Sequence, residues 1–423
     1  MRMKKTLLFF GGMALSVTFA ATVFAGAIEN KTNWSAEYIR TLNRNAATDY
    51  ADIAAYNPAG TVKLTEGFII NGSLQYLSKE YENVVNGTSF ESDEPSYIPG
   101  IFGVYNTGKW SLYGAFSNYG GGGKVDFSDG NATTVSLAAG LLGNPLCPPY
   151  SGTCTNFGAQ QLSAESFYLG YTIGGAYSLN DMVSFSIGLR YIDAHREAQG
   201  SVMVWNADYT VPFTAKVDYE QDDSGFSGIF GANLSPTDKL NIGIRYEMKT
   251  SLDLKATVYE GAAILADLDT PIVNGESVSR DLPALLGLGA SYQITPKLRT
   301  EVNYTYYFNE DADWSGAEET INNGYDIGIS LEYRFNEKIL GSIGYLHTEL
   351  GVDPANFLPE NPELDANTLG AGIAYAFTEK FHTNFSIGNS FYEDDSYVAP
   401  SGALIEYKKN VFFLALGLEY RFM

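Results

Sequence analysis

The sequence predicts an all-β protein, a transmembrane β-barrel of 14 antiparallel strands. The chain is rich in glycine and aromatic residues, with 44 Gly, 30 Tyr and 25 Phe among 423 residues. Several segments of about ten residues alternate strictly between apolar and polar side chains. Short polar turns alternate with long connections, which is typical of barrels that cross outer membranes.

The first 25 residues have the pattern of a cleaved secretory signal peptide. Arg2, Lys4 and Lys5 form a basic start, residues 6–22 are apolar and uncharged, and the small residues of segment 23–27 suit signal peptidase. The alternative is an uncleaved membrane anchor, but no stop-transfer charges follow. Since no other segment is apolar for 18 residues or more, we expect no helical membrane span.

The alternating segments predict which side of each strand meets lipid. In the last segment one face carries Glu419 and Arg421, and the other carries Phe412, Leu414, Leu416, Leu418, Tyr420 and Phe422. Successive side chains of a strand point to opposite faces. A soluble barrel would turn the apolar face inward, but the charges here suit a hydrated lumen and the apolar face suits lipid. The segments also have the roughly 9–11 residues that a tilted strand needs to cross the hydrocarbon.

The strand count follows from the connections. Six short polar segments have turn composition, at residues 107–109, 180–181, 235–238, 295–297, 336–338 and 378–380. With a first strand near residues 67–77 and a last near 407–422, they give fourteen strands. Long connections remain near residues 78–96, 120–163, 197–224, 251–281, 310–322, 351–366 and 394–406. We assign a further strand-like segment, 213–221, to an extracellular extension, because it would make the count odd.

The charge and the cysteines exclude several classes of site. The formal charge of −23 becomes −26 when Arg2, Lys4 and Lys5 leave with the signal peptide, which argues against nucleic-acid binding. We expect the acidic loops to meet lipopolysaccharide through divalent cations, and we predict neither a cofactor nor a dedicated metal site. Cys147 and Cys154 would form a disulfide in an oxidising compartment; the alternative is two free thiols.

Residues 28–66 precede the first strand and do not alternate. Ser35 is placed to cap a short helix over residues 38–42. Arg40 and Arg44 are four residues apart, which would put them on one face of that helix.

The run of residues 51–60, Ala-Asp-Ile-Ala-Ala-Tyr-Asn-Pro-Ala-Gly, resembles the FadL/TodX transporters. Its position between a signal peptide and a fourteen-strand pattern carries more weight than the triplet Asn57, Pro58 and Ala59 alone. The resemblance implies that residues 26–66 form a hatch inside a barrel of residues 67–423. Such a hatch is physically sensible, since a barrel of this size is too wide for its own side chains to fill. The alternative for Asn57 and Pro58 is a simple turn before the first strand.

The resemblance also implies a function, the passive uptake of long-chain fatty acids or other hydrophobic small molecules across the outer membrane of a Gram-negative bacterium. In this family long loops capture the ligand, which leaves sideways beside the hatch, where the third strand kinks. Here that strand spans about residues 109–119, and Gly114 and the run 120–123 would permit an irregular backbone. Lateral exit suits a lipid, because the membrane dissolves it better than the periplasm does.

Two long connections hold apolar residues that fit a capture groove. They are Leu137, Leu141 and Leu142 in one connection, and Ile264 and Leu265 in the other. The alternative is that these side chains pack the loops against each other.

Four arginines are candidate partners for a ligand carboxylate. Arg190 and Arg196 face the lumen by strand parity, and Arg40 and Arg44 lie in the proposed hatch. The alternative is that each balances a luminal acid, among them Glu247, Glu301 and Glu332.

Other functional classes are less well supported. A barrel hydrolase would use a histidine with a Ser or Asp partner, but His195, His347 and His382 lie in no hydrolase signature, so we expect no enzyme. A general diffusion porin for polar solutes is the stronger alternative, although such porins usually have more strands and lack a hatch-like segment. An adhesin or structural barrel is a third possibility. We expect the barrel to work as a monomer.

Overall fold

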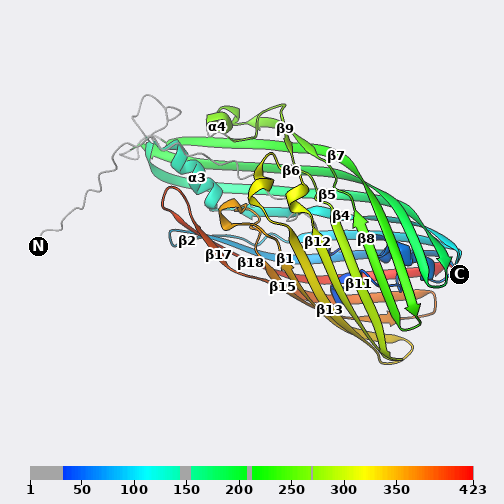
Figure 1. Cartoon of the computed structure of the whole chain (residues 1–423). Helices are drawn as coiled ribbons and strands as arrows, with labels where there is room; N and C mark the ends of the chain where they lie inside the picture. The colour runs from blue at the N-terminus through cyan, green and yellow to red at the C-terminus, as the bar shows by residue number, and fades with distance from the viewer. Residues whose placement is uncertain (1–31, 143–153, 207–211, 268–269, 423) are drawn as a thin grey trace, which may run out of the picture.

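The computed structural model describes residues 32–142, 154–206, 212–267 and 270–422, and in them one antiparallel sheet closes into a barrel (Figure 1). Fourteen strands of these described residues form the wall, as the sequence predicts. Closure is made by β1 and β18, with Phe68 opposite Phe422. The wall strands are β1 (Gly67–Val85), β3 (Ser96–Asn106), β4 (Trp110–Phe127), β5 (Cys154–Asn180), β6 (Val183–Asn206), β7 (Pro212–Thr237), β8 (Leu240–Glu247), β11 (Leu285–Thr295), β12 (Leu298–Tyr307), β13 (Gly324–Arg334), β14 (Ile339–Glu349), β15 (Ala366–Ala376), β16 (Phe381–Tyr392) and β18 (Leu404–Phe422).

Short elements decorate this wall. Shorter strands extend the sheet at β2 (Thr88–Ser92), β9 (Asp253–Glu260), β10 (Ser277–Ser279) and β17 (Asp395–Val398). The helices are α1 (Ala36–Thr41), α2 (Ile53–Tyr56), α3 (Ala132–Leu141) and α4 (Ala262–Asp267), with 3-10 turns η1 (Pro58–Lys63), η2 (Asn309–Asp311), η3 (Ala317–Thr320) and η4 (Pro354–Asn356). Among the described residues, none of the helices has the length and apolar character to cross a membrane.

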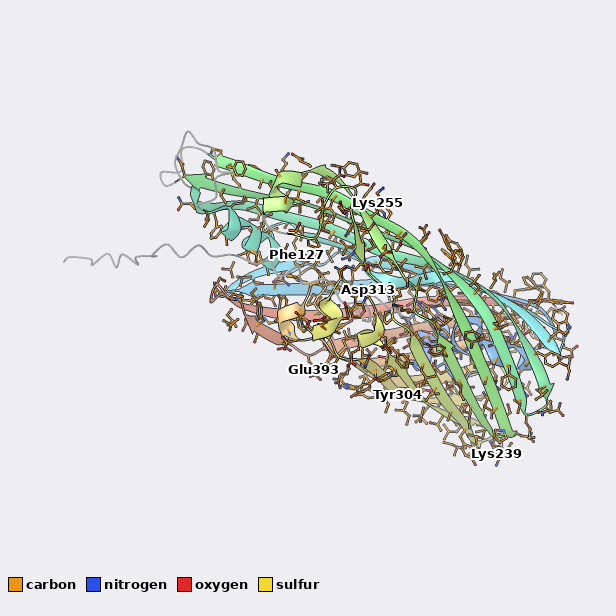
Figure 2. All side chains as sticks on the ribbon, turned by 45° about the horizontal axis from the view of Figure 1, so that its top comes forward. Phe127, Lys239, Lys255, Tyr304, Asp313 and Glu393 are labelled. Carbon is orange, nitrogen blue, oxygen red and sulfur yellow. The ribbon has the colours of Figure 1, made fainter. Side chains whose placement is uncertain are left out.

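The wall carries its apolar side chains on the outside. Along β18, Leu416, Leu418 and Tyr420 are 49%, 45% and 40% exposed, whereas Ala415 and Glu419 on the other face are 3% and 0% exposed. A soluble barrel would bury the apolar face, so the exposed face is the one that meets lipid. The predicted orientation is confirmed, and Figure 2 shows how densely side chains cover the outer surface.

The short turns lie together at one end of the barrel (the turn end), where Figure 2 labels Lys239. Side chains fix them, as at Asn180, whose Oδ1 accepts hydrogen bonds from the backbone N–H groups of Met182 and Val183, both at 2.9 Å. The first and last wall residues, Gly67 and Phe422, lie at this end as well. The chain that precedes β1 therefore enters the lumen from the turn end.

At the opposite end (the loop end) the strands are longer than the sequence predicts. β6 runs to Asn206 and β7 starts at Pro212, so most of the predicted loop 197–224 is strand, and the segment 213–221 is an extension of β7. β4 and β5 likewise take up both ends of the predicted loop 120–163. These extensions of β5, β6 and β7, with β9 beside β7, form a projecting sheet that we term the blade (Figure 1).

The blade escaped prediction because its polarity is reversed relative to the wall. On β6 the inward residues Val202 and Val204 are buried, while Asp193 and Glu197 point outward. The apolar face is therefore inside, as in a soluble sheet, which indicates that the blade stands in water above the lipid.

Replacing an outward wall residue by arginine should therefore be costly only below the blade. Ile173→Arg on β5, at a side chain that is 68% exposed to the lipid side, is expected to destabilise the barrel by about 2–4 kcal/mol. Thr214→Arg, on the outer face of the blade, is the matched control and should cost less than about 1 kcal/mol. Urea unfolding in lipid vesicles measures both, and equal costs would contradict the assigned lipid boundary.

Candidate functional site

The N-terminal segment forms a compact hatch inside the barrel, seen in blue in Figure 1. Ser35 caps α1, since its Oγ accepts a hydrogen bond from the N–H of Tyr38 at 3.0 Å, as the sequence predicts. The same hydroxyl donates to Asp52 at 2.8 Å and so ties α1 to the later part of the hatch. α1 ends at Leu42, whose φ of 55° is left-handed. Arg44 therefore lies beyond the helix, and the prediction that it shares a helical face with Arg40 is wrong.

Side chains of the wall satisfy the backbone of the hatch on several sides. The N–H of Ala46 donates to Glu301 of β12 at 2.9 Å, and the N–H of Ala51 donates to Glu419 of β18 at 2.8 Å. On other strands, serine hydroxyls bond Ala36 and Ala59 through the pairs Ala36 N–H to Ser73, Ser386 to Ala36 O, and Ser184 to Ala59 O. A segment without a regular sheet of its own is thereby fixed in place, since buried backbone groups need partners.

Glycines of the wall let the hatch backbone touch the sheet directly. A Cβ added at Gly344 of β14 would lie 1.9 Å from the carbonyl oxygen of Thr41. One added at Gly370 of β15 would lie 2.2 Å from the carbonyl oxygen of Ile39. No larger residue fits at these positions unless the hatch moves away from the wall.

Buried ion pairs hold the interior of the hatch. Arg44 Nη2 lies 2.5 Å from Asp52 Oδ1 and 2.8 Å from Asp49 Oδ1. Burial would raise the pKa of Asp49, but Arg44 and then Arg299 outweigh it and hold that pKa well below its usual range. Arg40 lies 3.5 Å from Glu332 of β13 and donates to Ser342 at 2.9 Å. Both candidate arginines of the hatch thus already face protein carboxylates.

The triplet Asn57, Pro58 and Ala59 joins the hatch to β6 and β7. Asn57 Nδ2 donates to the carbonyl oxygen of Ala47 at 2.9 Å and to Asn233 Oδ1 of β7 at 2.8 Å. Pro58 starts η1, where its fixed φ suits the first position and its missing N–H costs nothing. The triplet is therefore a turn and also a brace.

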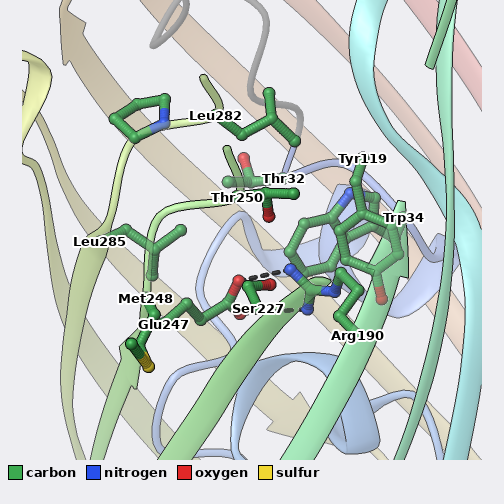
Figure 3. A pocket seen from close by; sticks show the side chains of 11 residues that line it. Thr32, Trp34, Tyr119, Arg190, Ser227, Glu247, Met248, Thr250, Leu282 and Leu285 are labelled. Atoms are coloured by element: carbon green, nitrogen blue, oxygen red, sulfur yellow. Dashed lines mark hydrogen bonds and ion pairs between the residues drawn. The ribbon is translucent and has the colours of Figure 1, made fainter. Parts of the chain in front are cut away.

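A small cavity of about 20 Å³ lies between the hatch and the wall (Figure 3). Trp34 of the hatch and Tyr119 of β4 form one side, with ring centroids 4.4 Å apart. Arg190 of β6 stacks its guanidinium 3.7 Å from the centroid of Tyr119 and donates two hydrogen bonds to Glu247 of β8. The other side is apolar, with Leu282, Leu285 and Met248.

The sequence alone did not identify Trp34 and Tyr119. Glu247 was recognisable as a luminal acid by parity, and Arg190 indeed pairs with it. Arg196 lies on the same inward face of β6, nearer the loop end. There its positive charge favours the ionised form of Glu360. A ligand carboxylate would have to displace protein carboxylates from Arg40, Arg44 and Arg190, and its binding to any of the four arginines stays a prediction.

β4 is irregular beside this cavity. Its register against β5 shifts twice, so that the five steps from Asn118 to Gly123 match only three steps on β5, from Leu169 to Ser166. Residues 117–121 are all buried, which ends the alternation of the strand. The irregular backbone predicted for residues 120–123 is confirmed.

The ladder between β3 and β4 stops at the same level. β3 pairs with β1 along its whole length, but with β4 only from Asn106 opposite Ser111 to Gly100 opposite Ser117. We term the unpaired stretch, residues 96–99 of β3 and 118–122 of β4, the β3–β4 break. Gly114 lies below it in regular pairing with both neighbours, so the irregularity predicted there is wrong.

Pro99 explains why the ladder stops. Its carbonyl oxygen accepts a hydrogen bond from Ser117 Oγ of β4 at 3.0 Å, so this residue presents its backbone to β4. In an antiparallel strand the N–H of a residue points to the same side as its C=O, and proline has no N–H. β3 thus lacks a donor where the pairing with β4 would continue.

The predicted capture residues lie at the loop end against the blade. Leu141 of α3 is buried on Val202 and Val204 of β6, and Leu137 and Leu142 are half-buried beside it. Leu265 of α4 is buried in a second cluster, and Ile264 is half-buried between the two clusters. Loop packing therefore uses much of this apolar surface, and ligand capture by it stays a prediction.

Two further predictions concern bonds and metals. Cys147 lies outside the described residues, and so does the predicted disulfide with Cys154. Within the described ranges, no group of three or more His, Cys, Asp and Glu side chains is arranged to hold a metal ion.

The fold is shared with transporters and channels of solved structure, although no protein-family model and no curated protein matches the chain. The structure of a FadL homologue from Pseudomonas aeruginosa matches with a TM-score of 0.71 at 12% identity, over 94% of this chain and 100% of that one. The toluene transporter TodX from Pseudomonas putida matches with a TM-score of 0.61 at 13% identity, over 90% of this chain and 97% of that one. The monoaromatic hydrocarbon channel CymD matches with a TM-score of 0.57 at 14% identity, over 95% and 98%. The chain thus has the FadL/TodX fold, which the resemblance at residues 51–60 implied.

The stability of the hatch should depend on the protonation of Glu37. Burial, and then the charge of Asp52, raise the pKa of Glu37 to about 8. In the folded state the carboxyl keeps a proton that the unfolded state releases, so its contribution is full below about pH 4.5 and is lost as the pH rises through about 8. Wild-type protein should therefore melt at a lower temperature at pH 9 than at pH 6. Glu37→Gln should lose part of that difference, and an undiminished pH dependence in the variant would contradict this assignment.

Crowding the hatch contact should unseat the hatch. Gly344→Ala places a methyl group 1.9 Å from the carbonyl oxygen of Thr41, an overlap expected to cost about 1–3 kcal/mol. Ion conductance in planar bilayers should rise. Gly175→Ala is the control, because its added Cβ would lie 3.4 Å from the nearest atom, Ser111 O. Similar conductance of the two variants would contradict the expectation that this contact holds the hatch in a sealing position.

Proposed function

We propose that this protein is an outer-membrane channel for the passive uptake of hydrophobic small molecules, which enter at the loop end and leave sideways through the β3–β4 break. The observation that carries the proposal is the combination of a lumen filled by a bonded hatch with a break in the wall beside it. The fold shared with FadL/TodX channels supports it.

The packing of the hatch argues against a straight axial path. Residues of α1 and α2 are buried, and hatch backbone groups bond to β1, β6, β12, β16 and β18. Moving the hatch would break many of these contacts together. A general diffusion porin would need that route, so the porin alternative receives no support from this arrangement.

A lateral route is supported by how closely the cavity approaches the break. Tyr119 belongs both to the unpaired stretch of β4 and to the lining of the cavity (Figure 3). The outer faces beside it are apolar, with Tyr97 and Ile101 of β3 64% and 52% exposed. A hydrophobic molecule that reached Tyr119 would pass from aromatic side chains into lipid without crossing water.

Several features of the cell context belong to the same proposal. We propose that residues 1–25 direct export, that the barrel works as a monomer in the outer membrane of a Gram-negative bacterium, and that it catalyses no reaction. The half-buried side chains of Leu137, Leu142 and Ile264 would collect ligand above the lumen. Exposed acids at the loop end, such as Glu393 in Figure 2, would meet lipopolysaccharide.

The ligand is proposed as a long-chain fatty acid or an uncharged hydrocarbon. Among the similar structures, one is named for the fatty-acid family and two for toluene or monoaromatic hydrocarbons. A fatty acid would in addition need a cation for its carboxylate, for which Arg196 at the loop end is the candidate that a ligand meets first.

Straightening β4 tests the route directly. Deleting Gly121 and Gly122 makes β4 as long as the stretch of β5 that it faces and should let β4 pair with residues 96–98 of β3, beyond Pro99. Uptake of oleate and of toluene by intact cells that express the variant should fall sharply, because the required path is closed. Liposome swelling with small sugars should stay low for both proteins. Unchanged uptake would refute lateral exit, and rapid sugar entry into wild-type liposomes would favour a porin.

A further inference from the structure

Lys79 is a buried lysine whose position relates it to the β3–β4 break. It lies on β1, faces the lumen and is 3% exposed. Along β1 it follows Leu77, which pairs with the first residue of β3, Ser96, and precedes Tyr81, which pairs with the last residue of β2, Ser92. Lys79 therefore lies between the two stretches of β1 that pair with β3 and with β2, opposite the connection between those two strands.

From this level the ammonium of Lys79 reaches across to β4. Its Nζ donates to the carbonyl oxygen of Lys124 at 2.5 Å and to that of Gly122 at 3.2 Å. Beside it, a Cβ added at Gly123 would lie 2.5 Å from Ser96 Oγ and 3.3 Å from Lys79 Nζ. The kinked strand is thus packed directly against the end of β3 and the ammonium.

The ammonium of Lys79 supplies hydrogen-bond donors to β4 that the sheet does not supply. Carbonyl groups of β4 that lose their partner in the sheet need other donors, and above the break β3 is not there to provide them. A charged donor forms stronger hydrogen bonds than a neutral one in a buried site. Above the break, Ser92 Oγ accepts a hydrogen bond from the N–H of Asp126 at 2.9 Å. Below the break, Ser117 Oγ donates to the carbonyl oxygen of Pro99.

We infer that Lys79 is a positioning residue that holds β4 in its kinked form and so keeps the β3–β4 break unpaired. This inference rests on the proposed function for its effect on uptake. Without the ammonium, the carbonyls of Gly122 and Lys124 lose their donors. β4 then gains by shifting toward the backbone edge of residues 96–98, which closes the break.

The chain offers a matched control in Lys409. This lysine lies on the adjacent strand β18 with its ammonium 4.8 Å from the ring centroid of Tyr81, near which Lys79 also lies, at 5.7 Å. Its Nζ bonds Asn361 Oδ1 at 2.8 Å and Pro362 O at 3.4 Å, which belong to the loop that covers Gly122 of β4. Removing it changes the same luminal charge but leaves in place the ammonium that donates to the carbonyls of Gly122 and Lys124.

The test compares Lys79→Met, Lys79→Arg and Lys409→Met with wild type in full-length protein. Uptake of oleate and of toluene by intact cells should fall by at least about tenfold in Lys79→Met, because the loss of even one charged hydrogen bond is worth about that factor. It should stay within about twofold of wild type in the other two variants. Hydrogen–deuterium exchange of the peptide covering residues 116–127 should slow in Lys79→Met only, because new pairing protects it.

The possible outcomes separate a failure of the role of Lys79 from a failure of the proposed function. The role of Lys79 would be overturned by any of three results. These are uptake in Lys79→Met equal to that of wild type, equal losses of uptake in both methionine variants, and unchanged or faster exchange in Lys79→Met. If wild type transports neither probe, the proposed function falls, while the exchange pattern still decides whether Lys79 holds the strand. If Lys79→Met fails to fold, Lys79→Gln keeps a polar side chain but removes the ammonium, and normal uptake and exchange in that variant would overturn the inference.

Discussion

A backbone that crosses hydrocarbon must have partners for its own N–H and C=O groups, because lipid offers none. Closure of β1 onto β18 meets this requirement around the barrel. The hatch, which has no sheet to pair with, meets it with Glu301, Glu419 and wall serines. At the β3–β4 break the ladder is interrupted, and Ser117, Ser92 and Lys79 supply side-chain partners instead. The proposed path through the wall is compatible with the membrane only because these groups replace the missing pairing.

The same requirement separates the wall from the blade. On β6 the outward residues change from Phe185, Ile187 and Leu189 to Asp193 and Glu197 along one continuous strand. Nothing in the backbone marks this change, which is carried by the side chains alone. The blade is thus an ordinary water-exposed sheet built from the strands that also span the membrane, and it places α3 and α4 above the lumen.

Much of the fold could be predicted because a period of two is visible in single strands. The alternation around Glu419 and the turn residues at Asn180 and Asn336 fix orientation and count. The strands of the blade could not be predicted from this alternation, since their apolar side chains face inward and those of the wall face outward. The end of α1 was also missed, because Leu42 takes a left-handed φ that usually belongs to glycine.

The site was less predictable than the wall. Asn57 and Ser35 were found from local motifs, and their contacts follow from those motifs. Trp34, Tyr119 and Lys79 depend on pairs that are distant in sequence, which parity does not reveal. Pro99 was a missed signal, because proline within a strand marks an edge without a donor and would have located the break.

Photo-crosslinking tests the central claim, lateral exit, most directly. A photoreactive group would be introduced at Tyr119 and at Asn118 in the break, and at Ile329 on the lipid face of β13 and Ala46 in the hatch for comparison. During uptake of radiolabelled oleate or toluene by intact cells, label should accumulate at Tyr119 and Asn118 above the level at Ile329, with little at Ala46. Label concentrated at Ala46, or no more label in the break than at Ile329, would contradict lateral exit.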